Sequence, residues 1–273
     1  MAHFQELKSN IDSSVNFVFE NGQEARYVQR PDTDYFICYL STHNGCNKAC
    51  RFCFLTQLGH TDFYPATINE ILEQAKVVLT HTRIIAPATL RVSFSFMARG
   101  EPLASNSAIY SAELFQKLES LALDFNLKHN IKVSTIFPKG FSVWANPYYF
   151  AYHNVRLYWS LYSLDMSWRK RWIPNGEDPI LTRQWVSTWQ GVSHRPIIIH
   201  DAWIERENDD QAQAIDEFLT GIPYRTNIVR YNPFSKHQGE ESSKLETIVI
   251  TMKNSKVIPR VGKDVMASCG MFV

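Results

Sequence analysis

Residues 45 to 53 read Gly45-Cys46-Asn47-Lys48-Ala49-Cys50-Arg51-Phe52-Cys53 and follow an apolar segment. Three of the chain's five cysteines therefore lie within eight residues, as a C-x3-C-x2-C loop. Cysteines that only fill a core have no reason to cluster in this way, and an odd total argues against a secreted disulfide framework. The loop instead indicates metal or redox chemistry, because three thiolates at this spacing can surround one face of a compact inorganic centre.

The number of thiolates narrows the choice of centre. A 4Fe–4S cluster usually has four Cys ligands, one per iron, so the loop of Cys46, Cys50 and Cys53 would leave one iron open to a small molecule. A structural zinc would need a fourth ligand, for which His43 and His60 are the nearest candidates. Inert buried thiols are the third interpretation. The spacing favours the cluster, since zinc loops more often pair C-x2-C with a second, distant pair.

Composition sets limits on the class of protein. The 273 residues are 45% hydrophobic and 20% charged, which excludes a disordered tail and suits one large domain or two small ones. The formal net charge of +1 gives no overall field toward nucleic acid, so any polyanion site must be local. No stretch approaches the roughly 18 apolar residues of a membrane span, and the polar segment 1–10 lacks the apolar run of a signal peptide. We therefore expect a cytoplasmic protein without a membrane partner.

The rest of the chain alternates between strand and helix patterns. Apolar, β-rich runs cover residues 35–40, 90–97, 131–137, 155–162, 196–203 and 226–231, and segments of helical period cover 68–79, 108–123, 181–189 and 211–219. Upstream, residues 16–19 and 24–28 flank Asn21-Gly22, which predicts a β-hairpin. Strands that alternate with helices predict an α/β fold with a parallel sheet and right-handed crossovers.

The three-cysteine loop, with an aromatic residue before its third cysteine, resembles that of radical S-adenosylmethionine (SAM) enzymes. Further motifs narrow the resemblance to the RlmN/Cfr group of adenosine methyl synthases: Phe96-Met97-Ala98-Arg99-Gly100-Glu101-Pro102, Val133-Ser134-Thr135, Ser160-Leu161-Tyr162, Asn232-Pro233-Phe234 and Ala267-Ser268-Cys269-Gly270. These motifs occur in the family's order and lie at or just after the predicted strands. The resemblance implies a partial (β/α)6 TIM-type barrel of the radical SAM type with a short N-terminal β-ribbon.

The resemblance also implies the domain organisation and the cofactors. We expect a single radical SAM domain over residues 1–273, with the ribbon in 1–34 and the barrel and C-terminal tail in 35–273. Only 45 residues precede Cys46, so the family's N-terminal RNA-binding domain is expected to be missing. The implied cofactors are a 4Fe–4S cluster on the three loop cysteines and SAM, whose amino and carboxylate groups bind the open iron.

The same motifs imply a set of SAM-binding residues. They are Gly100, Glu101, Ser134, Ser160 and Asn232. The glycine lets backbone approach a ligand, the carboxylate accepts from the SAM ammonium, and the hydroxyls and the amide contact the ribose, carboxylate or adenine. Taken singly, each is also readable as an ordinary turn or strand-end polar residue. The sequence departs from the family at two positions, where Ala98 replaces Gly and Tyr162 replaces His.

The resemblance assigns the central chemistry to Cys269. In the family, one SAM methylates this cysteine, and a second SAM, reduced by the cluster, yields a 5′-deoxyadenosyl radical that takes a hydrogen from the S-methyl group. The resulting carbon radical adds to C2 or C8 of an adenine. A radical is needed because these electron-poor ring carbons cannot attack an electrophilic methyl group. Without the resemblance, a lone Cys beside Gly is more simply a packing residue.

Two further roles belong to the family mechanism. Cys38 is the candidate for the second thiol, which releases the protein–nucleic acid crosslink by forming a disulfide, yet it lies one residue further from Cys46 than in the family. A one-residue slip turns a strand side chain to the opposite face, so without a bulge Tyr39 takes the place of the thiol and Cys38 is core. Glu24 resembles the base that removes the ring proton. Its alternative interpretation is a solvated carboxylate on the ribbon.

The sequence supports three functional hypotheses. The first is a radical SAM enzyme that methylates an adenosine in rRNA or tRNA and takes electrons from a flavodoxin or ferredoxin. The second is a radical SAM enzyme that acts on a peptide or small metabolite without methyl transfer, and the third is a non-enzymatic Fe–S or zinc module that binds nucleic acid.

Candidate RNA contacts are few. The segment Trp168–Trp172 either meets phosphates and stacks a base, or is a solvated helix face with two buried Trp. Arg225 and Arg230 bracket a predicted strand and are candidates for the mouth of the barrel, while Arg51 and Arg99 sit beside the cofactor motifs. Scattered arginines of this kind do not identify RNA by themselves.

Overall fold

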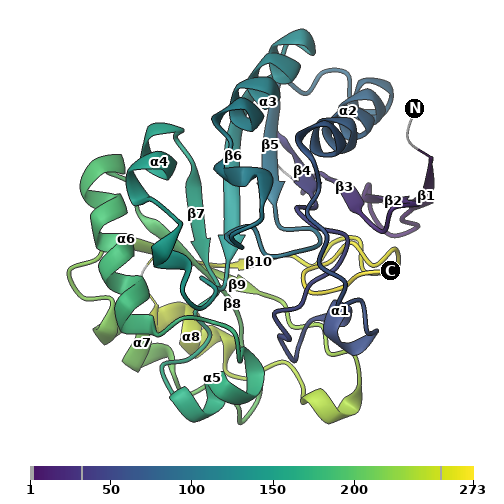
Figure 1. Ribbon diagram of the computed structural model, residues 1–273. Helices are drawn as coiled ribbons and strands as arrows, with labels where there is room; N and C mark the ends of the chain where they lie inside the picture. The colour runs from purple at the N-terminus through teal and green to yellow at the C-terminus, as the bar shows by residue number, and fades with distance from the viewer. Residues whose placement is uncertain (1–2, 32, 253) are drawn as a thin grey trace.

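The computed structural model describes residues 3–31, 33–252 and 254–273. Within them, ten strands form one sheet in the order β1 to β10 (Figure 1). The strands are β1 Phe4–Lys8, β2 Val15–Phe19, β3 Glu24–Val28, β4 Phe36–Leu40, β5 Arg91–Phe96, β6 Lys128–Thr135, β7 Arg156–Trp159, β8 Ile197–Ala202, β9 Tyr224–Val229 and β10 Ser255–Ile258. Strands β1 to β4 pair antiparallel, and β4 to β10 pair parallel. Because the edge strands β1 and β10 do not pair with each other in the described residues, the sheet is an open one.

The sequence patterns predicted most of this sheet. The six apolar runs are the strands β4 to β9, and the hairpin around Asn21-Gly22 joins β2 to β3, so the predicted α/β fold is confirmed. The patterns missed β1 and β10. Both are short edge strands whose side chains are mostly exposed or half-buried, so neither has an apolar face to detect.

Helices follow most of the parallel strands and cover the outer face of the sheet (Figure 1). They are α1 Phe54–Gln57, α2 Ile68–Ile85, α3 Ala112–Asp124, α4 Pro147–Tyr152, α5 Met166–Trp172, α6 Pro179–Ser193, α7 Ala212–Phe218 and α8 Leu245–Thr251. The four predicted helical segments correspond to α2, α3, α6 and α7. Thr67 and Glu70 form a capping box at the start of α2, and Asp178 with Pro179 starts α6. No helix in the described residues is both long enough and apolar enough to cross a membrane.

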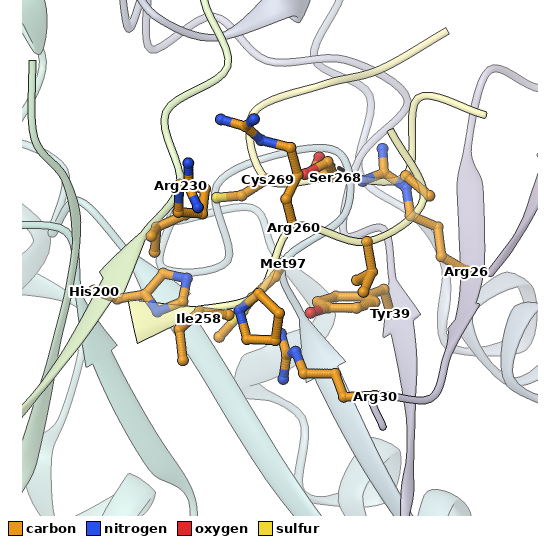
Figure 2. Close-up of a pocket in the computed structure, with 14 residues that line it drawn as sticks. Arg26, Arg30, Tyr39, Met97, His200, Arg230, Ile258, Arg260, Ser268 and Cys269 are labelled. Carbon is orange, nitrogen blue, oxygen red and sulfur yellow. Dashed lines mark hydrogen bonds between the residues drawn. The ribbon is translucent and has the colours of Figure 1, made fainter. Parts of the chain in front are cut away.

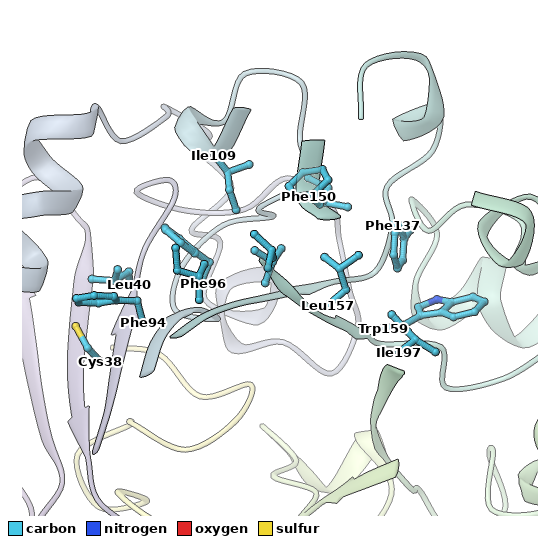
Figure 3. Packing of buried hydrophobic residues seen from close by; sticks show 14 of the residues in the cluster. Cys38, Leu40, Phe94, Phe96, Ile109, Phe137, Phe150, Leu157, Trp159 and Ile197 are labelled. Carbon is cyan, nitrogen blue, oxygen red and sulfur yellow. The ribbon is translucent and has the colours of Figure 1, made fainter. Parts of the chain in front are cut away.

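The hydrophobic core lies between the sheet and these helices (Figure 3). Successive residues of a strand point to opposite faces, so every second residue of each parallel strand enters this core. Its fully buried members include Cys38, Leu40, Phe94, Phe96, Leu157 and Trp159.

The inner face of the sheet is polar. Near the carboxyl ends of the strands it carries Ser134, Ser160 and His200, and further from those ends Lys132 and Asn227. Closed eight-stranded β/α barrels usually fill their interior with branched apolar side chains. Because polar and cationic side chains line the interior here, it keeps open cavities at both ends of the strands.

Candidate active site

The three-cysteine loop follows β4 and is held by backbone contacts. A Cβ atom at Gly45 would lie 2.4 Å from the carbonyl oxygen of Asp62, so only glycine fits where the loop closes. The N–H of Arg51 donates to the carbonyl of Trp172 (2.8 Å), and the N–H of Phe54, at the start of α1, donates to the carbonyl of Gly270 (2.9 Å). The loop is thus fixed to α5 on one side and to the C-terminal segment on the other.

The chemistry of the loop fits a cationic centre. Burial raises the pKa of Cys46 to about 12 and that of Cys53 to about 11, and it raises the pKa of Cys50 well above its ordinary value. The thiols of Cys46 and Cys53 also lie close enough to Cys50 to raise its pKa by charge repulsion. Three buried thiols so near one another stay protonated on their own, and become thiolates only beside a positive charge such as iron.

The structure does not favour a single metal ion in this loop. Among the described residues, no three His, Cys, Asp or Glu side chains converge as one ion requires. His43, a candidate zinc ligand, stacks on Phe63 with ring centroids 3.8 Å apart, and its ring nitrogens pair with Thr42 (2.9 Å) and Asn106 (3.1 Å). An iron–sulfur cluster does not require the three thiolates to converge on one point, because each thiolate binds its own iron.

A row of stacked aromatic rings packs against the three-cysteine loop. The ring of Phe52 lies 4.5 Å from that of Tyr162, which stacks on Trp168, and Trp168 stacks on Trp172. Both tryptophans are buried, and Arg169 between them donates to three backbone carbonyls. The base-stacking interpretation of the segment Trp168–Trp172 is therefore wrong, since this segment is a structural support.

A pocket lies beside the loop at the carboxyl ends of the strands; we call it the strand-end pocket. Among the predicted residues, its lining includes Cys53, Gly100, Ser134, Ser160, Asn232 and Cys269. Its volume is about 820 Å³ including the space open to solvent. The fold therefore brings four of the five predicted SAM-binding residues together beside the cysteine loop.

Asn232 is the residue of this pocket with the clearest unmet hydrogen-bonding capacity. Its Nδ2 donates to Ser268 Oγ (3.1 Å) and to the carbonyl of Cys269 (3.0 Å). Its Oδ1 is buried and has no hydrogen-bond partner within the described residues. A buried acceptor of this kind calls for a ligand donor, so the pocket fits a polar cofactor such as SAM.

Glu101 has a mainly structural environment. Its Oε1 accepts from Thr135 Oγ1 and from the N–H of Leu103 (3.0 Å), and its Oε2 accepts from the N–H of Ile136 (3.3 Å). Burial raises the pKa of this carboxyl in spite of these bonds. Glu101 does not line the strand-end pocket, whereas Gly100, which precedes it, does.

Cys269 separates the strand-end pocket from a second one, which we call the arginine pocket. Figure 2 shows Cys269 above a cavity surrounded by Arg26, Arg30, Arg230 and Arg260, with the rings of Tyr39 and His200 below. The residue is exposed, yet packing around its sulfur raises the thiol pKa to about 11, which Arg26 and Arg30 partly offset. The thiol thus lies where the two pockets meet.

Cys38 does not reach either pocket. Its side chain is fully buried in the core on the outer face of β4, while Tyr39 on the inner face lines the arginine pocket (Figures 2 and 3). Strand β4 pairs residue by residue with β3 and β5, with no bulge to restore the register. The resolving role predicted for Cys38 is therefore corrected, because the one-residue shift turned this thiol into the core.

Cys38→Ala is accordingly expected to leave substrate turnover unchanged and to lower the free energy of unfolding by only about 1 kcal/mol, the typical effect of one substitution. Urea denaturation and a turnover assay on the same preparation check both statements. Accumulation of a covalent adduct between the protein and its substrate in Cys38→Ala alone would contradict this assignment.

Glu24 is not a free base either. Its carboxylate is completely buried and lies 2.7 Å from Arg26 Nη2 and 2.8 Å from Arg99 Nη2. Burial alone would raise the pKa of Glu24, but the two guanidinium groups outweigh it and hold the pKa below its ordinary value. Glu24 lines neither pocket and is the centre of these ion pairs, so the structure gives no support to its predicted role as catalytic base.

The ion pairs of Glu24 fix the segment that carries Cys269. The carboxylate accepts from the N–H of Val273 (3.1 Å), and Arg26 Nη2 donates to the carbonyl of Met271 (2.7 Å). The guanidinium of Arg26 also lies over the ring of Phe272, 4.6 Å from its centroid. The ribbon residue Glu24 and its partners therefore hold the C-terminal segment against the strand ends.

Sequence reasoning did not assign Arg26, Arg30, Arg260 or His200 of the arginine pocket to a site, although it named Tyr39 as the alternative to Cys38. His200 lines both pockets, and burial together with Arg30 and Lys132 lowers its pKa to about 3, so the imidazole is uncharged at neutral pH. The sequence signal for His200 was a histidine in a predicted parallel strand, close to the strand ends that line the site.

The predicted mouth residues Arg225 and Arg230 lie at opposite ends of β9. Only Arg230 reaches the pockets at Cys269.

Comparisons with known proteins agree with this site. The chain is 27% identical over 269 residues to a dual-specificity RNA methyltransferase RlmN from Wolinella succinogenes, a match that covers 92% of this chain and 69% of the relative. A protein of the same name from Ruthia magnifica is 27% identical over 279 residues, with 96% and 75% covered. No family model matches the chain.

A solved structure shares the fold. The crystal structure of a radical SAM methyltransferase from Sphaerobacter thermophilus superposes with a TM-score of 0.76 at 17% sequence identity, covering 99% of this chain and 80% of that one. The fold is therefore that of a radical SAM methyltransferase. The sequence matches confirm the predicted resemblance to RlmN proteins, and the shared fold agrees with the predicted radical SAM methyltransferase type.

Proposed function

We propose that this protein methylates an adenosine in RNA, with Cys269 as the residue that carries the methyl group. The relatives reported above are named as RNA methyltransferases, and the chain matches them over nearly its whole length. The proposed cofactors are a 4Fe–4S cluster on Cys46, Cys50 and Cys53 and a SAM molecule in the strand-end pocket.

The observation that carries the proposal is the position of Cys269 between two pockets. One adjoins the cysteine loop and, within a mainly apolar lining, holds the unpaired acceptor of Asn232. The other is lined by four arginines: Arg26 pairs with Glu24, and Arg230 and Arg260 share Glu241, so Arg30 carries the charge that best suits a phosphate of a nucleic acid. A methyl carrier must face its donor on one side and its acceptor on the other, and the thiol of Cys269 does both.

The remaining residues of the site would bind and orient the cofactor and the substrate. In the strand-end pocket, Ser134, Ser160 and Asn232 would hold the polar groups of SAM. When bound, SAM and the reduced cluster would supply both the methyl group and the radical chemistry that an electron-poor adenine carbon requires. The uncharged ring of His200 offers a proton acceptor beside Cys269, and Tyr39 offers an aromatic face to a base.

The environment of Cys269 bears on how its thiol would be activated. Its pKa of about 11 leaves little thiolate at neutral pH. Arg26 and Arg30 already act to lower that pKa, and a sulfonium bound in the adjoining pocket would lower it further. Methylation of Cys269 is thus proposed to depend on occupancy of the strand-end pocket. We propose that the reaction takes place in the cytoplasm, with a flavodoxin or ferredoxin as electron donor.

The proposal predicts an S-methyl group on Cys269. Protein produced with SAM carrying an isotopically labelled methyl group is expected to bear that label on the tryptic peptide that spans residues 264–273. Peptide mass spectrometry separates this label from oxidation of the two methionines in the same peptide. Cys269→Ser should lose the label and all substrate methylation, while Cys38→Ser should keep both.

One result would contradict the methyl-carrier role of Cys269. Cluster-containing wild-type protein that cleaves SAM reductively but never labels Cys269 would rule out the methyl-carrier role. The hypothesis of a radical SAM enzyme without methyl transfer would then replace it.

A further inference from the structure

A third cavity lies at the opposite end of the parallel strands from the candidate active site; we call it the lower cavity. Its lining includes Arg156 and Arg225 at the amino-terminal ends of β7 and β9, Lys256 of β10 and, further along its strand, Lys132 of β6. Its volume is about 1220 Å³ including the space open to solvent. On β7 and β9 the active-site residues lie at the other strand end, so this cavity is separate from the two pockets at Cys269.

The lining of the lower cavity is cationic and has no counter-charge. Its residues are Tyr35, Arg91, Asn130, Lys132, Arg156, Tyr158, Ile198, Arg225, Asn227, Asn254, Ser255 and Lys256, so five cations and no carboxylate line it in the described part of the chain. Arg91 pairs with the exposed Asp34 at the rim. Within the described residues, the side chains of Lys132, Arg156, Arg225 and Lys256 make no ion pair.

Lys132 shows that this excess of charge extends into the barrel. The residue is only 8% exposed, and its ammonium lies over the ring of Tyr35, 5.2 Å from the centroid. Burial lowers its pKa to about 7, and the nearby charges of Arg30, Arg156 and Lys256 contribute. Burial among other cations disfavours the charged form of Lys132, and an anion bound beside it would restore that charge.

We propose that the lower cavity binds a small phosphate-bearing anion, such as pyrophosphate or a nucleotide, through Lys132, Arg156, Arg225 and Lys256. Arginine forks match phosphate geometry, lysine contributes a point charge, and the amides of Asn130 and Asn227 add neutral donors. A ligand must enter the barrel to reach Lys132, which favours a small anion over an RNA strand. The site is independent of the proposed methyl transfer.

Calorimetric titration of the cluster-containing protein tests the proposal, with phosphate, pyrophosphate and ATP as probes at constant ionic strength. Saturable binding of pyrophosphate or ATP is expected. Lys132→Met and Arg156→Gln should each weaken it about tenfold or more, as expected for the loss of a charged hydrogen bond. The exposed Lys76 on α2 provides the control, and Lys76→Gln should bind like wild type. Stronger binding of ATP than of pyrophosphate would indicate a nucleotide as the ligand.

A second readout follows the amine of Lys132 directly. Its low pKa makes it reactive toward acetic anhydride at neutral pH, and pyrophosphate should protect it, as mass spectrometry of the peptide would show. Thermal unfolding establishes that Lys132→Met is folded, which is expected because it removes an unpaired buried charge. Absence of saturable binding by all three probes, or equal binding by wild type and Lys132→Met, would overturn the proposal. Binding of an RNA oligonucleotide alone that is weakened by Lys132→Met would also overturn it, in favour of a nucleic-acid site.

Discussion

Cys50→Ala is expected to lose the iron centre and all reductive cleavage of SAM. The pKa of Cys50 is raised by burial and by both neighbouring thiols. Without Cys50, two thiolates remain for a cluster that needs at least three protein ligands when one iron is left open. The loss should exceed the roughly 100-fold typical of mutating a group that only supports a ligand.

The measurements are iron and sulfide content after anaerobic reconstitution and the amount of 5′-deoxyadenosine released under reduction. Cys38→Ala is the matched control, because it removes a buried thiol that lies outside the loop. Cys46→Ala and Cys53→Ala should behave like Cys50→Ala. Full iron content in Cys50→Ala, or one zinc and no iron in wild type, would refute the assignment of the loop.

Glu24→Gln is expected to cost about 3–5 kcal/mol of unfolding free energy, because it leaves Arg26 and Arg99 as buried charges without their partner. That is a large share of the stability of an ordinary domain. The effect should be local at first, with faster amide exchange in residues 268–273, whose backbone the same groups hold. Methylation of Cys269 should fall while iron content stays at the wild-type level.

The control for Glu24→Gln is Glu20→Gln, an exposed carboxylate on the same ribbon, which should change stability by less than about 0.5 kcal/mol. Urea denaturation as a function of pH gives the second check. The folded-state pKa of Glu24 lies below its ordinary value of 4.5, so its stabilisation is present above that value and is lost as the pH falls through the folded pKa. The stability difference between wild type and Glu24→Gln should therefore shrink in acid. A variant of full stability that lacks only the final proton removal would instead restore the role of a base.

The sequence predicted the parts of the fold that depend on local pattern. Six strands and four helices follow from apolar periodicity, and the three-cysteine loop follows from its spacing. The pocket residues Ser134, Ser160 and Asn232 were predicted because strand-end residues of a parallel sheet meet at one edge. These signals lie within a few residues of the structure they specify.

The environments that the sequence did not predict depend on contacts with residues far away along the chain. Glu24 has the position of a base, but its partner Arg99 lies 75 residues further on and its contact with Val273 spans 249 residues. Cys38 depends on the register between β3, β4 and β5, which a single sequence constrains only through its alternation. Lys132 stands within an apolar run, so its inward direction became visible only once the faces of the sheet were known.

The hydrogen bond from Phe54 to Gly270 joins the iron-binding loop to the segment that bears the nucleophile. Since the ribbon grips that same segment through Arg26, both ends of the chain and the metal loop form one mechanical unit. Both the cysteine loop and the ribbon therefore determine where Cys269 lies. A change in the conformation of the loop is expected to shift Cys269 relative to both pockets.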